Sequence, residues 1–466
     1  MGKIPKRPFH FTSLIAHYAG GAPARSGEGR TGPSLHPPHP GASANLTAQQ
    51  WVCMQPRCIT KKFVLYFCKK SEVAMNILDF SENIKFVGVD DREIDLFEGQ
   101  YKVPDGISYN SFVFFDEKIA VTDSVDAHKV SEWLQNIENA LQGKTPDYLI
   151  VHHLEPDHAG GIVEFVQKYP NATIVASAKA LAFLPQFVKL PEGAKTQTVK
   201  EGDTLSLGKH NLKFFAAPMV HWPEVLFSYD ESEKVLFSAD AFGTFGLSGK
   251  LGEEWVNEAR RYYINIVGKY GLQVQGIIKK LADVEIKTIC PLHGPVITSD
   301  ICFYVNKYDI WSSYAPETQG VFVAYAGVYG HTAEAAKKLA ESLRAKGVDV
   351  TIKDLCRTYI SESVAQAFRY SHLAICATTL DAGLFPTAER FLTHIKAKNY
   401  SNRKVGIVEN GSWAPMAAKK MHEILDTLKN VTFCENTVTL KSALDETSTA
   451  KLEELAVEIA KDFGVN

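Results

Sequence analysis

The sequence predicts an α/β protein with two folded parts, a mixed part rich in antiparallel sheet and then a parallel, doubly wound sheet. Two observations support this. Between residues 77 and 314, short apolar runs alternate with turns that carry Gly, Pro, Asp and Asn, as in strands joined by tight connections. After residue 320, strand and helix patterns alternate regularly, which is typical of βαβ units. Apolar residues make up 45% of the chain and charged residues 22%, as in ordinary globular enzymes.

The first part is expected to run over residues 75–315. Its predicted strands lie at residues 111–115, 119–122, 148–152, 173–176, 212–216, 225–229 and 234–238. The pattern changes at Pro316-Glu317-Thr318-Gln319-Gly320, so we place the boundary near residues 315–320.

The second part is expected to run over residues 319–466. It begins with a buried strand at 321–325, a glycine loop, and a helix over 332–346 that Gly347 ends. The remaining predicted strands lie at 348–353, 372–377 and 404–408, and the remaining helices at 387–396, 415–428 and 450–463.

Residues 1–74 differ in composition from the rest of the chain. They are rich in Pro and Gly, basic, and contain only Glu28 and Glu72 as acids. No helix or strand period is sustained, so we expect a disordered extension. A basic, acid-poor leader also resembles an organellar targeting segment. We favour an extension without a targeting role, and therefore expect a cytoplasmic protein.

Charge, hydropathy and cysteine spacing exclude several classes. The net charge is −3, which does not predict nucleic-acid binding. No apolar run approaches the roughly 20 residues of a membrane span, so no membrane association is expected. The five cysteines after residue 70 form no C-x-x-C pair, which excludes a built-in rubredoxin or zinc-ribbon site.

Imidazoles and carboxylates gather at predicted strand ends. The candidate metal ligands are His153, Glu155, Asp157, His158, His221, Asp240 and His293. A single histidine of this kind is more often a core or surface residue. The first four, however, lie within six residues beside a buried strand, where they would be costly to bury without a cation. Four imidazoles and three carboxylates suit two metals if one carboxylate bridges them, and this donor set suits iron better than zinc.

Three loops follow the carboxyl ends of predicted parallel strands in the second part, where ligands bind in such folds. One such glycine loop alone is often an ordinary tight turn. Together, the three predict a phosphate at a helix N-terminus and an aromatic ring beside Trp413. The candidate cofactor residues are Tyr329, Gly330, His331, Thr332, Thr379, Gly383, Asn410, Gly411, Ser412 and Trp413.

The cluster H-x-E-x-D-H at residues 153–158 resembles the metallo-β-lactamase superfamily, whose hydrolases carry His where Glu155 stands. That replacement is the signature of the flavodiiron proteins, and the remaining ligand pattern also matches. The second part resembles flavodoxin, and residues 409–415 look like a flavin loop of the same family. Residues 97–101 and 108–111 are similar to it as well. The chain departs from the family pattern at Gly327, where Ser or Thr is usual, and at Thr378, where Pro is usual.

The resemblance implies a metallo-β-lactamase-like αβ/βα sandwich followed by a flavodoxin-like doubly wound sheet. One iron would be held by His153, Glu155, His221 and Asp240. The second would be held by Asp157, His158, Asp240 and His293, with Asp240 bridging. FMN and two Fe ions per chain are the implied cofactors, and no catalytic residue beyond the metal ligands is implied.

The implied activity is an oxidoreductase that reduces dioxygen to water, nitric oxide to nitrous oxide, or both. Electrons would come from an external donor, either a rubredoxin-like carrier or a flavin or NAD(P)H reductase. The resemblance also implies a head-to-tail homodimer or a tetramer. The alternative is a zinc hydrolase with an accessory flavodoxin domain, which Glu155 disfavours. Tyr262, Tyr263 and Asn265 could tune the choice of gas, although we expect plain packing for at least two of them.

Overall fold

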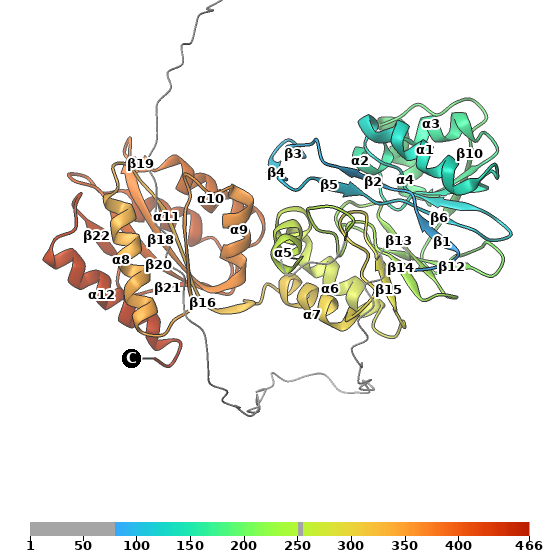
Figure 1. Ribbon diagram of the computed structural model, residues 1–466. Helices are drawn as coiled ribbons and strands as arrows, with labels where there is room; N and C mark the ends of the chain where they lie inside the picture. The colour runs from blue at the N-terminus through green and yellow to red at the C-terminus, as the bar shows by residue number, and fades with distance from the viewer. Residues whose placement is uncertain (1–79, 250–254, 466) are drawn as a thin grey trace, which may run out of the picture. The chain divides into compact units, whose positions relative to one another are not determined.

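The computed structural model describes residues 80–249 and 255–465. The expectation of disorder for residues 1–74 therefore lies outside the described residues. Helices and strands follow the chain as Figure 1 shows. In the described part of the chain, no helix is both long and apolar enough to cross a membrane.

Two sheets form the first part. The six-stranded sheet has the order β1-β6-β7-β8-β9-β10 and the five-stranded sheet the order β11-β12-β13-β14-β15. The strands of the first sheet are β1 (Ile84–Phe86), β6 (Phe112–Phe114), β7 (Ala120–Thr122), β8 (Tyr148–Ile150), β9 (Thr173–Ser177) and β10 (Lys195–Val199). Those of the second are β11 (Thr204–Ser206), β12 (Asn211–Ala216), β13 (Leu226–Asp230), β14 (Val235–Phe237) and β15 (Thr288–Cys290).

The two sheets pack face to face. Phe112 and Phe114 of β6 lie in one buried cluster with Phe214 of β12 and Phe237 of β14. Helices cover the outer faces, with α1, α3 and α4 on one side and α5, α6 and α7 on the other (Figure 1). Their bounds are α1 (Val130–Leu141), α3 (Ile162–Lys168), α4 (Ala178–Phe183), α5 (Trp255–Ile266), α6 (Gly271–Lys280) and α7 (Ile301–Ser312). This is a four-layered αβ/βα sandwich.

Two short hairpins and two short helices stand close to the sandwich strand ends. One hairpin pairs β2 (Val89–Asp91) with β5 (Ile107–Tyr109), and the other pairs β3 (Leu96–Phe97) with β4 (Tyr101–Lys102). The short helices are η1 (Ala127–Lys129) and α2 (Pro156–Ala159). Sequence patterns did not predict these hairpins, because strands of two or three residues show no measurable period.

The second part is a sheet with the order β17-β16-β18-β20-β21, in which β22 also pairs with β20, and β19 pairs with the end of β18. Numbered along the chain, its parallel strands run 2-1-3-4-5, which is the flavodoxin-like order. The strands are β16 (Thr318–Ala326), β17 (Val350–Asp354), β18 (Tyr370–Leu380), β19 (Gly383–Leu384), β20 (Arg403–Asn410), β21 (Val431–Phe433) and β22 (Val438–Leu440).

Helices cover both faces of this sheet. Alternation along β16 places Val321 and Val323 in a core with α8 and α12, whereas Phe322 and Ala324 join the core on the opposite face, with α9, α10 and α11. The bounds are α8 (His331–Ala345), α9 (Ile360–Arg369), α10 (Pro386–Ala397), α11 (Ala417–Leu425) and α12 (Glu446–Lys461). The predicted fold class, a sandwich followed by a doubly wound sheet, is confirmed.

A buried ion cluster holds the segment that precedes β16. The carboxylate of Glu317 accepts hydrogen bonds from Arg260 Nε and Nη2 at 2.6 and 2.9 Å, Lys307 Nζ at 2.7 Å and Trp311 Nε1 at 2.9 Å. Burial raises the pKa of Glu317, but the bonds and charge of Arg260 outweigh it and lower that pKa to about 2.

Replacing Glu317 by glutamine is expected to change the acid dependence of stability. A lowered carboxyl pKa contributes stability above the pKa of the unfolded chain, and this contribution is lost as pH falls through the folded pKa. The wild-type free energy of unfolding should therefore lose about 3 kcal/mol relative to Glu317→Gln between about pH 5 and pH 2. Denaturant titrations at a series of pH values measure it. Glu285→Gln, at a solvent-exposed position, is the control, and parallel curves for wild type and Glu317→Gln would contradict the expectation.

Candidate functional site

All seven candidate metal residues lie at strand ends or in the loops and short helix that follow them. His153 and Glu155 follow β8, and Asp157 and His158 lie in α2 directly afterwards. His221 lies between β12 and β13. Asp240 follows β14 and His293 follows β15, and these two strands are parallel neighbours, so both side chains start from the same edge of the sheet. The structure brings the seven together as two groups.

The first group consists of His153, Glu155, His221 and Asp240. Glu155 Oε2 lies 3.2 Å from His153 Nε2 and 3.0 Å from His221 Nε2. Asp240 Oδ2 lies 3.4 Å and 3.0 Å from the same two nitrogen atoms. Two imidazoles and two carboxylates therefore point their donor atoms at one small space.

The second group consists of Asp157, His158 and His293. Asp157 Oδ2 lies 3.3 Å from His158 Nε2 and 3.2 Å from His293 Nε2. Asp240 faces this group with its other oxygen, because Oδ1 lies 3.3 Å from His158 Nε2 and 3.6 Å from His293 Nε2. The two oxygen atoms of Asp240 thus serve different groups, which is the geometry of a bridging carboxylate.

The buried carboxylate oxygens of this cluster fit a cation. Among the described residues, neither oxygen of Asp157 nor Oδ1 of Asp240 has a hydrogen-bond partner, although all three are buried. Buried polar atoms are normally paired, and a carboxylate left unpaired in the interior is costly. Metal ions would satisfy these oxygens, and the set of imidazoles and carboxylates without a thiol suits iron.

Charge within the cluster is balanced between acids and imidazoles. Burial raises the pKa of Asp240, but the neighbouring imidazoles of His158 and His221 outweigh it and hold that pKa well below its usual range. Burial lowers the pKa of His221, but Asp240 and Glu155 outweigh it and raise the pKa to about 9. The Asp240 carboxylate is therefore ionised and can bind cations.

Two further groups orient the imidazoles, and the sequence patterns did not reveal them. Glu224 is buried, and its Oε1 lies 2.7 Å from His153 Nδ1 and accepts a hydrogen bond from the Leu154 amide. The carbonyl of Ser108 accepts a hydrogen bond from His293 Nδ1 at 2.7 Å. Each bond fixes the ring and leaves Nε2 facing the cluster. Glu224 stands three residues after His221, and this proximity is the one sequence signal that could have suggested it.

The residues considered for tuning the choice of gas differ in their surroundings. The buried ring of Tyr262 lies 5.5 Å from that of His293. Tyr263 instead packs against Tyr308, and the Asn265 amide donates to the carbonyls of Arg261 and Ser361. Of the three, only Tyr262 contacts a residue of the cluster.

Glu98 is a further acid near the cluster. It stands in the turn between β3 and β4, within electrostatic reach of Glu155, His221 and Asp157. Loss of solvent around its carboxyl group, together with the charge of Glu155, raises its pKa to about 7.

The candidate cofactor residues of the second part lie on three loops at the carboxyl ends of β16, β18 and β20. Tyr329 and Gly330 precede α8, and His331 and Thr332 are its first two residues. Thr379 lies near the end of β18, and Gly383 begins β19. Asn410 ends β20, and Gly411, Ser412 and Trp413 follow it. Tyr329 and Trp413 are 96% and 92% exposed, so large aromatic faces stand open beside these loops.

Hydrogen bonds tie these loops together. Asn410 Nδ2 donates to Thr332 Oγ1 at 3.3 Å. Thr379 Oγ1 accepts from the amides of Met416 and Ala417, at the N-terminus of α11. The free amides at the start of α8 fit a phosphate, and the exposed aromatic rings fit a flavin.

The departure from the family pattern at Gly327 has a packing cause. A Cβ atom there would lie 2.8 Å from Thr332 Oγ1 and 2.9 Å from Thr332 Cβ. Thr332 is buried, so a side chain at position 327 would displace it. Close packing of Thr332 therefore leaves room only for glycine at position 327, and the loop lacks the hydroxyl that Ser or Thr would supply there.

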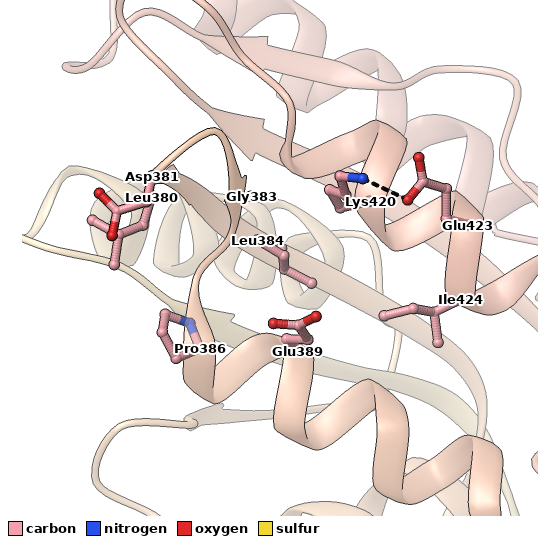
Figure 2. A pocket seen from close by; sticks show the side chains of 9 residues that line it. All are labelled: Leu380, Asp381, Gly383, Leu384, Pro386, Glu389, Lys420, Glu423 and Ile424. Carbon is pink, nitrogen blue, oxygen red and sulfur yellow. Dashed lines mark hydrogen bonds and ion pairs between the residues drawn. The ribbon is translucent and has the colours of Figure 1, made fainter. Parts of the chain in front are cut away.

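A cavity of about 370 Å³ borders the second of these loops. Figure 2 shows its lining: Leu380, Asp381, Gly383, Leu384, Pro386, Glu389, Lys420, Glu423 and Ile424. An ion pair of 2.7 Å joins Lys420 to Glu423 on one wall. Gly383 is the only candidate cofactor residue in this lining, so the cavity does not coincide with the space between the three loops.

Comparison with known proteins agrees with this geometry. Residues 107–294 match a family described as "ODP family beta lactamase". The chain is 30% identical over 394 residues to the uncharacterized protein MJ0732 of Methanocaldococcus jannaschii, covering 83% of this chain and 99% of that protein. It is 26% identical to the anaerobic nitric oxide reductase flavorubredoxin of Vibrio vulnificus, covering 73% of this chain and 71% of that protein.

Diflavin flavoprotein A 1 of Synechocystis is 30% identical, over 59% of this chain and 49% of that protein. The chain spans about half the length of the cyanobacterial diflavin flavoproteins it matches.

Two solved structures match nearly from end to end. Rubredoxin oxygen:oxidoreductase from Desulfovibrio gigas has a TM-score of 0.76 and 28% identity, covering 83% of this chain and 98% of that chain. The flavodiiron protein from Giardia intestinalis has a TM-score of 0.78 and 25% identity, covering 84% and 97%. The chain therefore belongs to the flavodiiron protein family, oxidoreductases that carry a flavin and a di-iron site.

Proposed function

We propose that this protein reduces dioxygen to water, nitric oxide to nitrous oxide, or both, with electrons that arrive through FMN. One observation carries the proposal: the two oxygen atoms of Asp240 face two separate groups of ligand atoms. Glu155 stands where the zinc hydrolases of the superfamily carry His, and its carboxylate adds negative charge that stabilises higher oxidation states of iron. The names of the D. gigas and V. vulnificus relatives point to oxygen and nitric oxide respectively.

We propose His153, Glu155, His221 and Asp240 as ligands of one iron, and Asp157, His158, Asp240 and His293 as ligands of the other. When bound, the iron pair supplies the place where the gas is reduced and FMN supplies the electrons. Asp240 would contribute one oxygen to each position. Glu224 and the Ser108 carbonyl keep His153 and His293 in the orientation that ligation requires.

We propose that FMN binds at the three loops of the second part. The amides at the start of α8 and the hydroxyl of Thr332 would hold its phosphate, while Trp413 would stack on the ring. Residues 75–315 would then form the iron domain and residues 319–466 the flavin domain. An external carrier or reductase would reduce the flavin, and a head-to-tail homodimer or a tetramer would pair flavin and iron sites between subunits.

Gas consumption by the reduced protein tests the proposed function. Purified protein is photoreduced, and its dioxygen and nitric oxide consumption rates are compared, with iron, zinc and FMN measured in the same preparation. Rapid consumption of at least one gas with iron and FMN present is the expected result. A protein that holds zinc and consumes neither gas would contradict the proposed function and favour the zinc hydrolase.

Trp413→Ala is expected to weaken FMN binding more than Thr332→Ala. Loss of stacking on a large ring costs on the order of 1–3 kcal/mol. One lost hydroxyl costs nearer to roughly 1 kcal/mol, because backbone donors remain for the phosphate. Trp413 is almost fully exposed, so its removal should not disturb folding. FMN titrations measure both variants, with Phe303→Ala, an exposed aromatic residue on α7, as the control. The reverse order would show that the flavin does not rest on Trp413.

A further inference from the structure

A hydrogen-bonded network centred on Asn410, made of Thr332, Thr378, Asn410 and Ser442, lies at the carboxyl end of β20. Sequence patterns placed Asn410 among the candidate cofactor residues, and the structure shows which atoms its side chain contacts. Nδ2 lies 3.3 Å from Thr332 Oγ1 and 2.9 Å from the Ser442 carbonyl oxygen, and Oδ1 lies 3.0 Å from the Ser442 amide nitrogen. Both hydrogens of the side-chain amide are therefore used within the protein.

The orientation of the Asn410 amide follows from its partners. A backbone N–H group can only donate, so the Ser442 amide requires Oδ1 of Asn410 on its side and Nδ2 on the other. Nδ2 then donates to Thr332 Oγ1, which accepts with a lone pair and keeps its own hydrogen. Because the ionised oxygen atoms of a phosphate only accept hydrogen bonds, this polarity suits a phosphate beside Thr332.

Ser442 brings a fourth loop into contact with the proposed flavin loops, namely residues 441–445 between β22 and α12. Its φ angle of 78° lies in the left-handed region, which is costly for a residue other than glycine. Asn410 bonds both the N–H and the C=O of Ser442, and the Gly411 amide donates to the Leu440 carbonyl at 3.0 Å. The third loop thus holds the fourth in one conformation.

The two positions at which the chain departs from the family pattern contact this network. Thr378 Oγ1 donates to the Asn410 carbonyl at 3.2 Å, a bond that proline cannot make because it has no hydroxyl. Gly327 leaves the space that Thr332 Oγ1 occupies, since a Cβ atom there would lie 2.8 Å from that oxygen. Hydrogen bonds therefore connect all three loops of the proposed flavin site with one another and with the fourth loop.

We propose that Asn410 is a positioning residue for the phosphate of FMN, which acts through Thr332 and does not touch the flavin. The inference rests on the flavin site proposed above. The first three amides of α8, at residues 331–333, have no hydrogen-bond partner in the described part of the chain. Such amides bind a phosphate best when they are already fixed, because binding then costs little conformational entropy. Asn410 fixes them from the third loop, through the Thr332 side chain.

Binding of FMN and of riboflavin to the flavin-free, full-length protein tests this role. The two ligands share the ring and differ only in the phosphate, so a residue that positions the phosphate affects FMN alone. The variants are Asn410→Ala, Thr332→Val, the double variant of these two, and Thr378→Val, which removes a hydroxyl that lies outside the phosphate loop. Thr332→Ser keeps the acceptor for Asn410. Quenching of flavin fluorescence measures each dissociation constant.

Two control variants remove comparable hydrogen bonds elsewhere in the second part. Asn436→Ala removes a side-chain amide that donates to Glu458, and Thr351→Val removes a hydroxyl that bonds the Tyr370 hydroxyl. Both controls should bind FMN and riboflavin as the wild type does. Thermal unfolding of each flavin-free variant shows that it is folded.

Asn410→Ala and Thr332→Val are each expected to raise the dissociation constant of FMN about five- to tenfold, and to leave that of riboflavin within about twofold. Thr378→Val should raise the FMN constant about threefold, and Thr332→Ser should stay near the wild type. The double variant should bind FMN no more than about tenfold less tightly than the wild type, because the two side chains share one hydrogen bond. Independent effects would multiply to about 25-fold or more.

Three results would overturn the inference: an unchanged FMN affinity in Asn410→Ala, equal losses of FMN and riboflavin, or effects that multiply in the double variant. If Asn410→Ala does not fold, Thr378→Val decides, and a wild-type FMN affinity there would overturn the inference. A wild-type protein that binds neither flavin would overturn the proposed flavin site and this role of Asn410 with it. A wild-type protein that binds FMN but consumes neither gas would overturn the proposed function alone.

Discussion

Asp240→Ala is expected to abolish gas reduction and to lower the iron content at both positions of the cluster. Oδ2 of this residue faces His153 and His221, and Oδ1 faces His158 and His293. A bridging carboxylate also offsets the repulsion between two cations, which a terminal imidazole does not. We expect iron to fall from about two to below about one per chain, and activity to fall by more than about 100-fold.

The matched comparison is His153→Ala or His293→Ala, each of which should weaken mainly one position. FMN content should stay at the wild-type value in all three variants, because the flavin loops lie on the other sheet, and it therefore reports correct folding. Iron per FMN and dioxygen consumption under an artificial donor are the measurements. If Asp240→Ala kept two irons per chain and normal turnover, the assignment of Asp240 as the ligand that bridges two irons would be wrong.

Glu224→Ala is expected to lower metal affinity at the His153 group about 10–100-fold, as for other carboxylates that orient a ligating histidine. Glu224 Oε1 fixes the His153 ring at 2.7 Å and also holds the Leu154 amide, so its removal frees both the ring and the start of the ligand segment. Glu224→Gln keeps an oxygen that can accept from His153 Nδ1 and should lose less. Competition with a chelator measures the affinity of each variant.

Glu164→Ala, at an exposed position on α3, is the control for this experiment. Loss of iron from both positions alike, or equal losses in Glu224→Ala and Glu224→Gln, would show that Glu224 stabilises the whole sandwich rather than one ring.

The sequence predicted most elements of the second part because they have a clear period or a clear end signal, but it placed none of the helices of the first part, such as α1 and α5. The helix predicted over 332–346 is α8 at His331–Ala345, and the strand predicted at 404–408 is β20 at Arg403–Asn410. The helix α9 at Ile360–Arg369 was missed. Its Ser361, Ser363 and Gln366 interrupt the apolar stripe, and tertiary packing decides such a segment rather than propensity.

The candidate metal residues could be chosen from sequence because they stand in one short motif and three strand-end loops. The residues that orient them could not be chosen in this way. Glu224 has no spacing relative to His153 that signals a contact, and the Ser108 group is a backbone carbonyl that any residue could supply. Such roles depend on the tertiary fold alone.

The hydrogen bond from His293 Nδ1 to the Ser108 carbonyl joins residues 185 positions apart, and this separation orders events during synthesis. The first ligand group is complete in the nascent chain once Asp240 has left the ribosome, whereas the second waits for His293. Helices α5 and α6 and strand β15 must emerge in between, and domains fold as units from the N-terminus. The proposed second metal position therefore cannot form before His293 has emerged, so we expect metal loading of the pair to be a late step in the maturation of this protein.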